Sequence, residues 1–157
     1  MNSLMLRPAN KEDLLPVSAL WQQLTAFHQQ MGLAFEINDD SPLKWVESFE
    51  RTLGRFSFLW VAEEDGRIGA FLLARIKRAP SYLGVSLVGE ISDLFVCDEF
   101  RGRKIATQLV DLALKEFTSQ KVHSVEVQVM VENLDGLKFW QLQGFKKELT
   151  LVRRKTG

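Results

Sequence analysis

The chain has 157 residues, of which 46% are hydrophobic and 25% are charged, and its 20 basic and 20 acidic residues cancel to a formal net charge of zero. This composition is ordinary for a globular protein, and the length fits a single domain spanning residues 1–157. Proteins that bind nucleic acid usually carry a basic excess, so the neutral balance argues against nucleic acid as a partner.

The distribution of apolar and metal-binding residues excludes several further classes. No run approaches the roughly 18 apolar residues of a membrane helix, and the first residues lack the apolar core of a signal peptide. We therefore expect a cytoplasmic protein with no membrane partner. Cys97 is the only cysteine, which excludes an internal disulfide and a thiolate zinc cluster, and two histidines, His28 and His123, do not favour a histidine-based metal site.

The first elements predicted are a short strand over Met5–Arg7 and a helix that follows Asn10. Asn10 can cap this helix, and Asp13 can reach back toward it. Helical spacing predicts a core-facing stripe, after which Gly32 stops the helix. The stripe contains Leu14, Val17, Trp21, Leu24 and Phe27.

A second helix is predicted to begin with Ser41 as N-cap and Pro42 at the first helical position, and to end at Gly54. Residues 36–50 contain five carboxylates and one lysine. Two interpretations of this stretch stay open. Asp39 and Asp40 can favour the dipole of the helix that follows, or the stretch can attract a cationic substrate.

A β-hairpin is predicted over residues 56–64 and 67–77, because Asp65-Gly66 lies between two apolar extended runs. Residues 85–97 form the next strand, whose apolar character on both faces favours a central position. The remaining elements are a helix from Ile105, an alternating strand over 125–131, a short helix over 133–143 and a last strand. The last strand contains Phe145, Leu149 and Leu151.

The turn at residues 101–104, between the central strand and the helix from Ile105, is suited to an anion. Its sequence, Arg-Gly-Arg-Lys, combines three cations with a glycine. Backbone N–H groups at a helix N-terminus have no intrahelical partner, and the helix dipole adds partial positive charge there. A phosphate or pyrophosphate is the simplest ligand, although neither the Walker loop nor the G-x-G-x-x-G fingerprint is present.

Residues 101–106, RGRKIA, resemble the acetyl-CoA pyrophosphate loop of the GNAT superfamily of N-acetyltransferases, R/Q-x-x-G-x-G/A, with Lys104 at the usual middle glycine. The preceding strand, EISDLFV, and residues 133–145, NLDGLKFWQLQGF, also lie where that family has its other two CoA-side elements. The likeness extends from Met5 to about Arg153. If Lys104 already lies in the first helical turn, it keeps ordinary φ and adds a cation; we favour this interpretation.

The resemblance implies an α/β fold, the GNAT acetyltransferase fold, with a mixed central sheet of six to seven strands and four helices in the order βααβββαβαβ. In that fold the strand from Val85 and the strand from Val125 run parallel and splay apart to admit the pantetheine arm. Homodimers occur in this family, which makes a homodimer possible here, but no dimer surface is evident from the sequence.

The resemblance also implies the cofactor acetyl-CoA and a set of residues that contact it. Backbone groups near Leu94 and Phe95 are expected to stabilise the thioester oxyanion, and Val96 to pair with pantetheine. The complete set expected at the cofactor is Leu94, Phe95, Val96, Arg101, Gly102, Arg103, Lys104, Ile105, Ala106, Thr107, Asn133 and Trp140. Asn133 has a second possible role as the N-cap of the helix that it begins.

Acetyl transfer to an amine requires a base, because a lysine-like amine has a pKa of about 10.4 and must lose a proton. Glu90 and Asp93 are the candidates, although their odd spacing puts them on opposite faces of a strand unless a bulge intervenes. Related polyamine acetyltransferases have a carboxylate where this chain has Ser92. We rank Glu90 slightly above Asp93, and a structural role for either residue stays open.

The family often protonates the departing thiolate with a tyrosine, and this chain has Trp140 at that position. An indole N–H can donate a hydrogen bond but cannot deliver a proton. The leading hypothesis is direct transfer of acetyl from acetyl-CoA to a primary amine of a small molecule or peptide. A catalytically silent CoA-binding sensor or interaction module is the alternative, and a nucleic-acid-binding domain is the least favoured.

Overall fold

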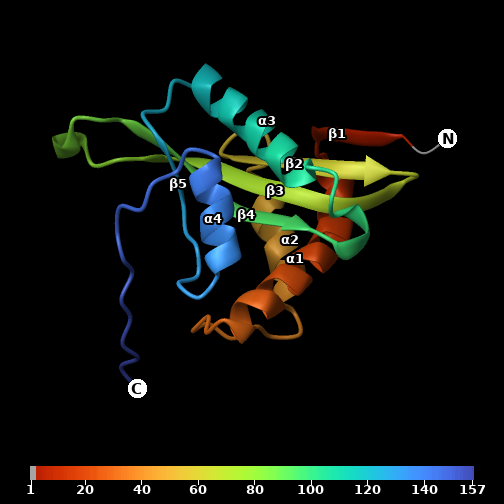
Figure 1. Ribbon diagram of the computed structural model, residues 1–157, viewed down its shortest axis with the longest axis horizontal. Coiled ribbons are helices and arrows are strands. Elements are labelled where there is room, and N and C mark those ends of the chain that lie inside the picture. The colour runs from red at the N-terminus through yellow and green to blue at the C-terminus, as the bar shows by residue number, and fades with distance from the viewer. Residues whose placement is uncertain (1–2) are drawn as a thin grey trace.

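The computed structural model describes residues 3–157 and consists of one sheet with helices on both faces (Figure 1). The five strands are β1 (Leu4–Pro8), β2 (Ser57–Glu64), β3 (Arg67–Arg78), β4 (Leu87–Val96) and β5 (Val125–Val127). The α-helices in this part of the chain are α1 (Leu14–Gln30), α2 (Ser41–Glu50), α3 (Ile105–Ser119) and α4 (Leu134–Leu142). Three 3₁₀ turns are η1 (Lys11–Asp13), η2 (Ser81–Leu83) and η3 (Asp98–Phe100).

The strands lie in the sheet in the same order as in the sequence, β1-β2-β3-β4-β5. All neighbouring strands are antiparallel except β4 and β5, which are parallel. A parallel pair needs a crossover, and α3 supplies it. Helices α1 and α2 cover one face of the sheet and α3 covers the other (Figure 1).

The core lies between these layers, and β3 runs through its middle. Residues 70–74 of β3 are between 0% and 2% exposed. The predicted hairpin is confirmed, because Asp65 (φ 52°) and Gly66 (φ 77°) are both left-handed, as a two-residue type I′ turn requires. The largest fully buried side chains are Phe71, Phe117, Leu14, Leu72, Ile91, Ile105, Leu109, Val17, Val61 and Val110.

Before α1, Asp13 reaches back to Asn10 as the sequence predicts. The backbone N–H of Asn10 donates to Asp13 Oδ2 at 2.8 Å, and Arg7 binds the same carboxylate at 2.7 Å. The predicted stripe of α1 is correct for Leu14, Val17 and Leu24, which are buried. It is wrong for Phe27, which is 41% exposed, because the sheet beneath the last turns of α1 opens into a cavity.

The second helix differs from the prediction at both ends. Asp40 rather than Ser41 is the residue before the first turn, and Ser41 Oγ accepts a hydrogen bond from the backbone of Asn38 at 2.8 Å. The helix ends at Glu50, four residues before Gly54, because residues 51–56 turn back to start β2. Asp40 also pairs with Lys44 at 3.1 Å.

The predicted six to seven strands are too many, since the described sheet has five. The alternating stretch 125–131 pairs with β4 only over Val125–Val127, because the two strands separate beyond that point. The predicted last strand, containing Phe145, Leu149 and Leu151, does not form, and residues 145–157 have no regular secondary structure. Hydrogen-bonded partners define a strand, and alternation alone does not supply them.

Within residues 3–157, no helix is both long enough and apolar enough to span a membrane.

Candidate active site

A β-bulge in β4 decides which side chains face the site. Leu73 of β3 lies opposite Asp93, but the next residue, Ala74, lies opposite Ile91, so Ser92 is an extra residue in β4. The bulge on which the placement of the two candidate carboxylates depends is therefore present. It restores Glu90 and Asp93 to the same face of the sheet, although their spacing in a regular strand would separate them.

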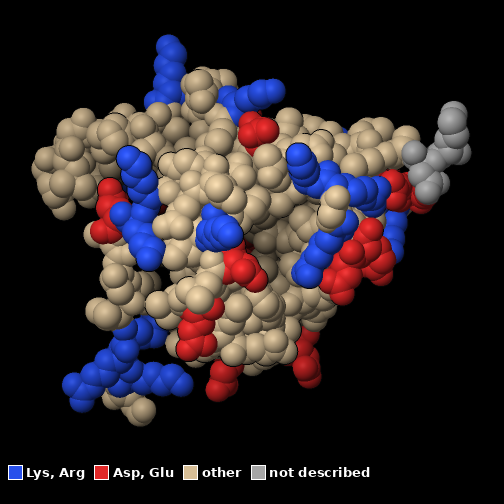
Figure 2. Space-filling view, viewed as in Figure 1, with Lys and Arg blue, Asp and Glu red and all other residues tan. Residues whose placement is uncertain are grey.

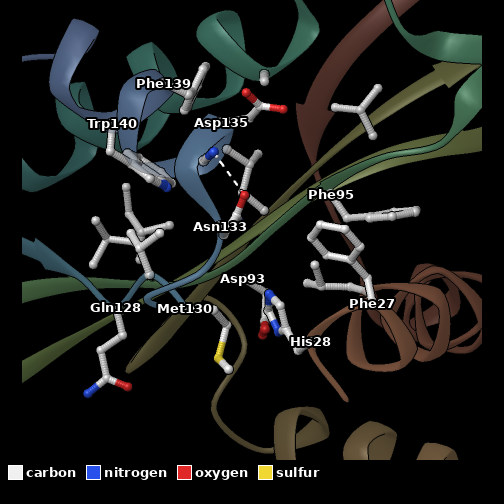
Figure 3. A pocket seen from close by; sticks show the side chains of 18 of the residues that line it. Phe27, His28, Asp93, Phe95, Gln128, Met130, Asn133, Asp135, Phe139 and Trp140 are labelled. Atoms are coloured by element: carbon white, nitrogen blue, oxygen red, sulfur yellow. Dashed lines mark hydrogen bonds between the residues drawn. The ribbon is translucent and has the colours of Figure 1, made fainter. Parts of the chain in front are cut away.

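Beyond the bulge, β4 and the chain that leaves β5 diverge and leave a cavity of about 550 Å³ between them. Residues 91–96 form one wall and residues 127–130 the opposite wall, while α1 and α4 contribute the remaining side chains (Figure 3).

The space-filling view shows basic and acidic side chains together on the face of the molecule seen in Figure 1, without dominance of one sign (Figure 2).

Asp93 lines this cavity. Burial raises the pKa of its carboxyl to about 6, a hydrogen bond from Ser92 Oγ (3.5 Å) opposes this rise, and the nearby charge of Glu90 adds to it. At neutral pH the group is ionised, yet it is a stronger base than an ordinary aspartate.

Glu90 has a different environment. It is 8% exposed, it is not among the residues that line the cavity, and it accepts hydrogen bonds from Arg75 (2.7 Å) and Lys77 (3.2 Å). Burial raises its pKa, but these two cations together hold it below its usual value. Lys77 also contacts Glu126 of β5, so Glu90 belongs to an ion-pair network that ties β3, β4 and β5 together.

Leu94, Phe95 and Val96 continue β4 along the cavity wall. They pair with β3 on one side, whereas the pairing of β4 with β5 stops at Ile91. Backbone N–H and C=O groups on the cavity side of this segment therefore have no strand partner. One of the carbonyls, that of Val96, accepts a hydrogen bond from Arg101 Nε at 3.1 Å.

The backbone of the turn at residues 101–104 differs from the prediction at Lys104. Gly102 (φ 81°) and Lys104 (φ 57°) are both left-handed, and α3 begins only at Ile105. The prediction that Lys104 has ordinary helical φ is wrong, because the chain must reverse direction between η3 and α3 within four residues. Tight turns of this kind form concavities of backbone N–H groups, which suit an anion.

The two arginines of the turn are held differently. Arg101 lines the cavity and pairs with Asp98 at 3.1 Å. Arg103 instead makes a bidentate contact with Glu64 at the end of β2, at 2.7 and 3.2 Å, and lies 5.1 Å from the centre of the Phe100 ring. Arg103 is thus engaged with Glu64, and Arg101 is the arginine that lines the cavity.

Of the other residues expected at the cofactor, Ala106 lines the cavity, while Ile105 belongs to the core at 2% exposed and Thr107 lies outside the cavity lining. Asn133 combines both of its expected positions. It lines the cavity, and its Oδ1 accepts a hydrogen bond from Gly136 N at 2.9 Å, which caps α4 (Figure 3).

Trp140 likewise lines the cavity while being 8% exposed. Phe139 and Phe145 contact it edge to face, each with ring centroids 5.1 Å away. Its indole therefore forms a fixed wall between the cavity and the aromatic cluster beneath α4.

The structure adds residues of α1 that the sequence reasoning did not assign to a site. Gln23, Phe27 and His28 line the cavity, and burial lowers the pKa of His28, which keeps its imidazole neutral at pH 7. Figure 3 shows Phe27 and His28 projecting from α1 toward the side of the cavity that holds Asp93. The spacing of Leu24, Phe27 and His28 puts them on one helix face, which is the only local signal for this wall.

Comparison with known proteins gives the family. The model of the Acetyltransferase (GNAT) family matches residues 18–145, more than half of the chain. The chain belongs to this family. A curated relative from Methanocaldococcus jannaschii, described as an uncharacterized N-acetyltransferase, is 36% identical over 61 residues. That match covers 39% of this chain and only 27% of the relative.

Solved structures of similar proteins have the same GNAT fold. The aminoglycoside acetyltransferase AAC(6')-Iy, solved with the bisubstrate analog CoA-S-monomethyl-acetylneamine, superposes with a TM-score of 0.77 at 24% identity, covering 99% of both chains. A predicted acetyltransferase from Clostridium acetobutylicum, solved with acetyl-CoA, superposes with a TM-score of 0.78 at 22% identity, covering 98% of this chain and 96% of the other.

Proposed function

We propose that this GNAT protein transfers acetyl directly from acetyl-CoA to a primary amine, within a complex that holds both substrates. The observation that carries the proposal is the cavity where β4 and β5 diverge, with Asp93 in its wall and Arg101 at its border. Two similar proteins support the proposal. The aminoglycoside N-acetyltransferase AAC(6')-Iy was solved with the bisubstrate analog CoA-S-monomethyl-acetylneamine, and the Clostridium protein was solved with acetyl-CoA.

In this proposal Asp93 is the base. Presenting a lysine-like amine in its neutral form at pH 7 costs about 5 kcal/mol, so a group must accept its proton directly or through water. A carboxylate with a pKa of about 6 is better matched to this task than an ordinary aspartate. Asp93 is a better candidate than Glu90, because Glu90 is hydrogen-bonded to Arg75 and Lys77 and does not line the cavity.

The neutral nitrogen then attacks the thioester carbonyl carbon, and the carbonyl oxygen gains negative charge. We assign the stabilisation of this charge to a backbone N–H near Leu94 or Phe95, where β4 has no strand partner on the cavity side. Val96 would pair with the pantetheine arm along the same edge. The attacking nitrogen then releases its second proton to solvent water, and collapse of the intermediate breaks the carbon–sulfur bond and leaves the neutral amide product and the CoA thiolate.

Trp140 cannot protonate that thiolate, and the reaction does not depend on it to do so. A thiol with a pKa near 8.5 costs only about 2 kcal/mol to leave unprotonated at pH 7, and solvent supplies its proton. Trp140 would instead form the rigid wall beside the departing sulfur, with Asn133 on the same side. We assign binding of the CoA pyrophosphate to Arg101, Lys104 and the backbone N–H groups of the turn at residues 101–104.

The acceptor in this proposal is a cationic primary amine of a small molecule or peptide. We place the reaction in the cytoplasm. The carboxylates of Asp93 and Asp135 and the amides of Gln23 and Gln128 line the cavity and can hold such a group. Polyamines, amino-acid derivatives, aminoglycosides and protein lysines share this chemistry.

The experiment that tests the proposal combines calorimetric titration with acetyl-CoA and thiol-release assays against a panel of primary amines. We expect binding, and thiol release with at least one amine. Asp93→Asn should lower kcat/KM by about 10²-fold or more while leaving acetyl-CoA affinity unchanged. In the wild type, kcat/KM should fall as the pH drops below about 6, because protonated Asp93 cannot accept a proton.

Glu90→Gln is the matched control, since it neutralises the neighbouring carboxylate on the same face of the sheet. It should retain kcat/KM within a few-fold if the variant remains folded. Full activity of Asp93→Asn would show that Asp93 is not the base. Binding without thiol release from any amine would instead identify a silent CoA-binding module, and absence of binding would overturn the proposal altogether.

A further inference from the structure

The wall of the cavity that α1 contributes is not used by the cofactor in the proposed function. Figure 3 shows Phe27 and His28 projecting from α1 toward the side of the cavity that holds Asp93. Leu24 lies one turn before His28 on the same helix face and also lines the cavity. Phe95 follows Asp93 by two residues in β4, so both side chains are on one face of the strand. The proposed base is thus set among apolar and aromatic side chains.

Phe27 presents an aromatic ring that the protein covers incompletely. Its side chain is 41% exposed, and its ring centre lies 6.1 Å from that of His28. Phenylalanine is usually buried, so a large exposed ring at the border of a cavity is an informative departure. Cavities that bind small molecules are lined mainly by such side chains, with a few polar groups that fix the orientation of the ligand. The ring of Phe27 therefore offers an apolar contact to the acceptor.

The charges in this part of the cavity suit one cation. Asp93 is ionised at neutral pH and supplies one negative charge. His28 is half-buried, and because burial lowers its pKa, its imidazole is neutral at pH 7 and does not repel a cation. The ammonium group of an acceptor would therefore meet a single anion, surrounded by Phe27, Phe95 and Leu24.

The other carboxylates do not provide a second site of this kind. Asp98 lines the cavity but pairs with Arg101 at 3.1 Å. Asp135 is exposed in the first turn of α4, on the side of Asn133 that we assign to the cofactor. The five carboxylates of residues 36–50 are exposed, and none of them lines the cavity. Further charges on a polycationic acceptor would therefore lose water beside Phe27 without gaining an anionic partner.

We propose that the acceptor is a primary monoamine with an aromatic or apolar body, whose amine lies at Asp93 and whose body packs against Phe27 and Phe95. This inference rests on the proposed acetyl transfer and narrows its acceptor class, since polyamines and aminoglycosides carry several charges. The chemical step is unchanged. Asp93 takes a proton from the ammonium group, the nitrogen attacks the thioester carbon, its second proton passes to solvent water, and the CoA thiolate leaves.

The first test compares kcat/KM for phenethylamine, ethylamine and spermidine in the thiol-release assay. The three amines present the same reacting group, and they differ in ring and charge. Burying a phenyl ring is worth about 10- to 100-fold in binding, so we expect kcat/KM for phenethylamine to exceed that for ethylamine by about this factor. Spermidine should be a poorer substrate than phenethylamine by about tenfold or more, because it has no ring and carries additional charges.

Variants at Phe27 test the contact itself. Phe27→Ala should lower kcat/KM for phenethylamine about fivefold or more, mainly through KM, and change that for ethylamine by less than about twofold. Phe56→Ala is the matched control, because Phe56 is 61% exposed and does not line the cavity, and it should change neither value. Calorimetric titration with acetyl-CoA shows that each variant is folded.

Phe27→Glu adds the second anion that the wild-type cavity lacks. It should shift the ratio of kcat/KM for spermidine to that for phenethylamine upward by about tenfold or more, because a second ammonium group then has a partner. An unchanged ratio would overturn the assignment of Phe27 to the acceptor site.

The outcomes separate this inference from the proposed function. Spermidine or ethylamine used as well as phenethylamine, or equal effects of Phe27→Ala and Phe56→Ala, would overturn the inference and leave acetyl transfer standing. Thiol release with no amine would overturn the proposed function. Calorimetric titration of the CoA-saturated protein would then decide the ligand class, since binding of phenethylamine about tenfold tighter than ethylamine supports it and equal binding overturns it. Absence of CoA binding would overturn both.

Discussion

At the scale of single residues, Lys104 is the position where this chain departs most clearly from the pyrophosphate loop that it otherwise resembles. The loop usually has glycine there, and the structure shows why, since the position requires φ of 57°. An L-residue pays about 1–2 kcal/mol in this region, which glycine avoids. The lysine therefore stores local strain beside the start of α3.

Lys104→Gly should raise the free energy of unfolding by about 0.5–1 kcal/mol, the relief of strain being partly offset by the greater freedom of glycine in the unfolded chain. It should also weaken acetyl-CoA binding through the loss of a cation. Urea unfolding and calorimetry measure the two effects. Lys121→Gly is a matched control, because Lys121 has φ of 58° but lies after the C-terminal end of α3, away from the turn at residues 101–104.

Lys121→Gly should stabilise the protein similarly and leave acetyl-CoA affinity unchanged. An equal loss of affinity in both variants would contradict a local role of Lys104 at the cofactor. A loss of stability in Lys104→Gly would contradict the left-handed conformation.

At the scale of elements, the packing of α3 against β4 sets the position of the strand that carries Asp93. Gly89 of β4 lies directly beneath Phe117 of α3, and a Cβ on this glycine would come within 2.6 Å of the Phe117 ring. Phe117 is 2% exposed and cannot move aside without disturbing the core. This close approach requires glycine.

Gly89→Ala should therefore lower the free energy of unfolding by about 1–3 kcal/mol, the usual cost of overpacking a core, as measured by denaturant unfolding. Shortening the opposing side chain provides the control. The double variant Gly89→Ala/Phe117→Leu should lose less stability than the sum of the two single variants. Strict additivity of the two losses would show that the clash is not the cause.

At the scale of the whole molecule, the raised pKa of Asp93 links global stability to pH. The folded protein holds this proton up to a pH of about 6, whereas the unfolded chain releases it near 3.9. Between these values the folded state binds more protons than the unfolded state, so the contribution of Asp93 to stability falls as the pH rises. Above about pH 6 the charged side chain is a constant cost.

Asp93→Asn should remove this cost. We expect the variant to be more stable than the wild type by about 1–3 kcal/mol at pH 8, with the difference shrinking toward zero below pH 4. Urea unfolding across this pH range gives the measurement. Wild-type stability that exceeds that of the variant at pH 8 would contradict the raised pKa.

Also at this scale, the predictions that held are those that depend on contacts within a few residues. The Asp65-Gly66 turn, the link from Asn10 to Asp13 and the order of the elements up to α4 all follow from local backbone preferences and side-chain spacing. The GNAT family could also be predicted from local sequence, because the loop motif and its flanking elements are contiguous in the sequence.

The choice between Glu90 and Asp93 needed the tertiary structure. Arg75 and Lys77 of β3 form ion pairs with Glu90. The bulge that directs Asp93 into the cavity is defined only by the pairing of β4 with β3. Neither environment can therefore be predicted from residues that are neighbours in the sequence. The pairing of Arg103 with Glu64, 39 residues away, could not be predicted from the sequence for the same reason.

By itself, then, the amino-acid sequence determined the family, the element order as far as α4 and the anion-suited turn of this protein, because these are encoded by short-range spacing. Only the tertiary structure decided which carboxylate faces the cavity, that α1 contributes Phe27 and His28 to it, and that residues 145–157 form no strand. Burial, charge pairing and strand pairing are set by residues far apart in the sequence, which meet only on folding.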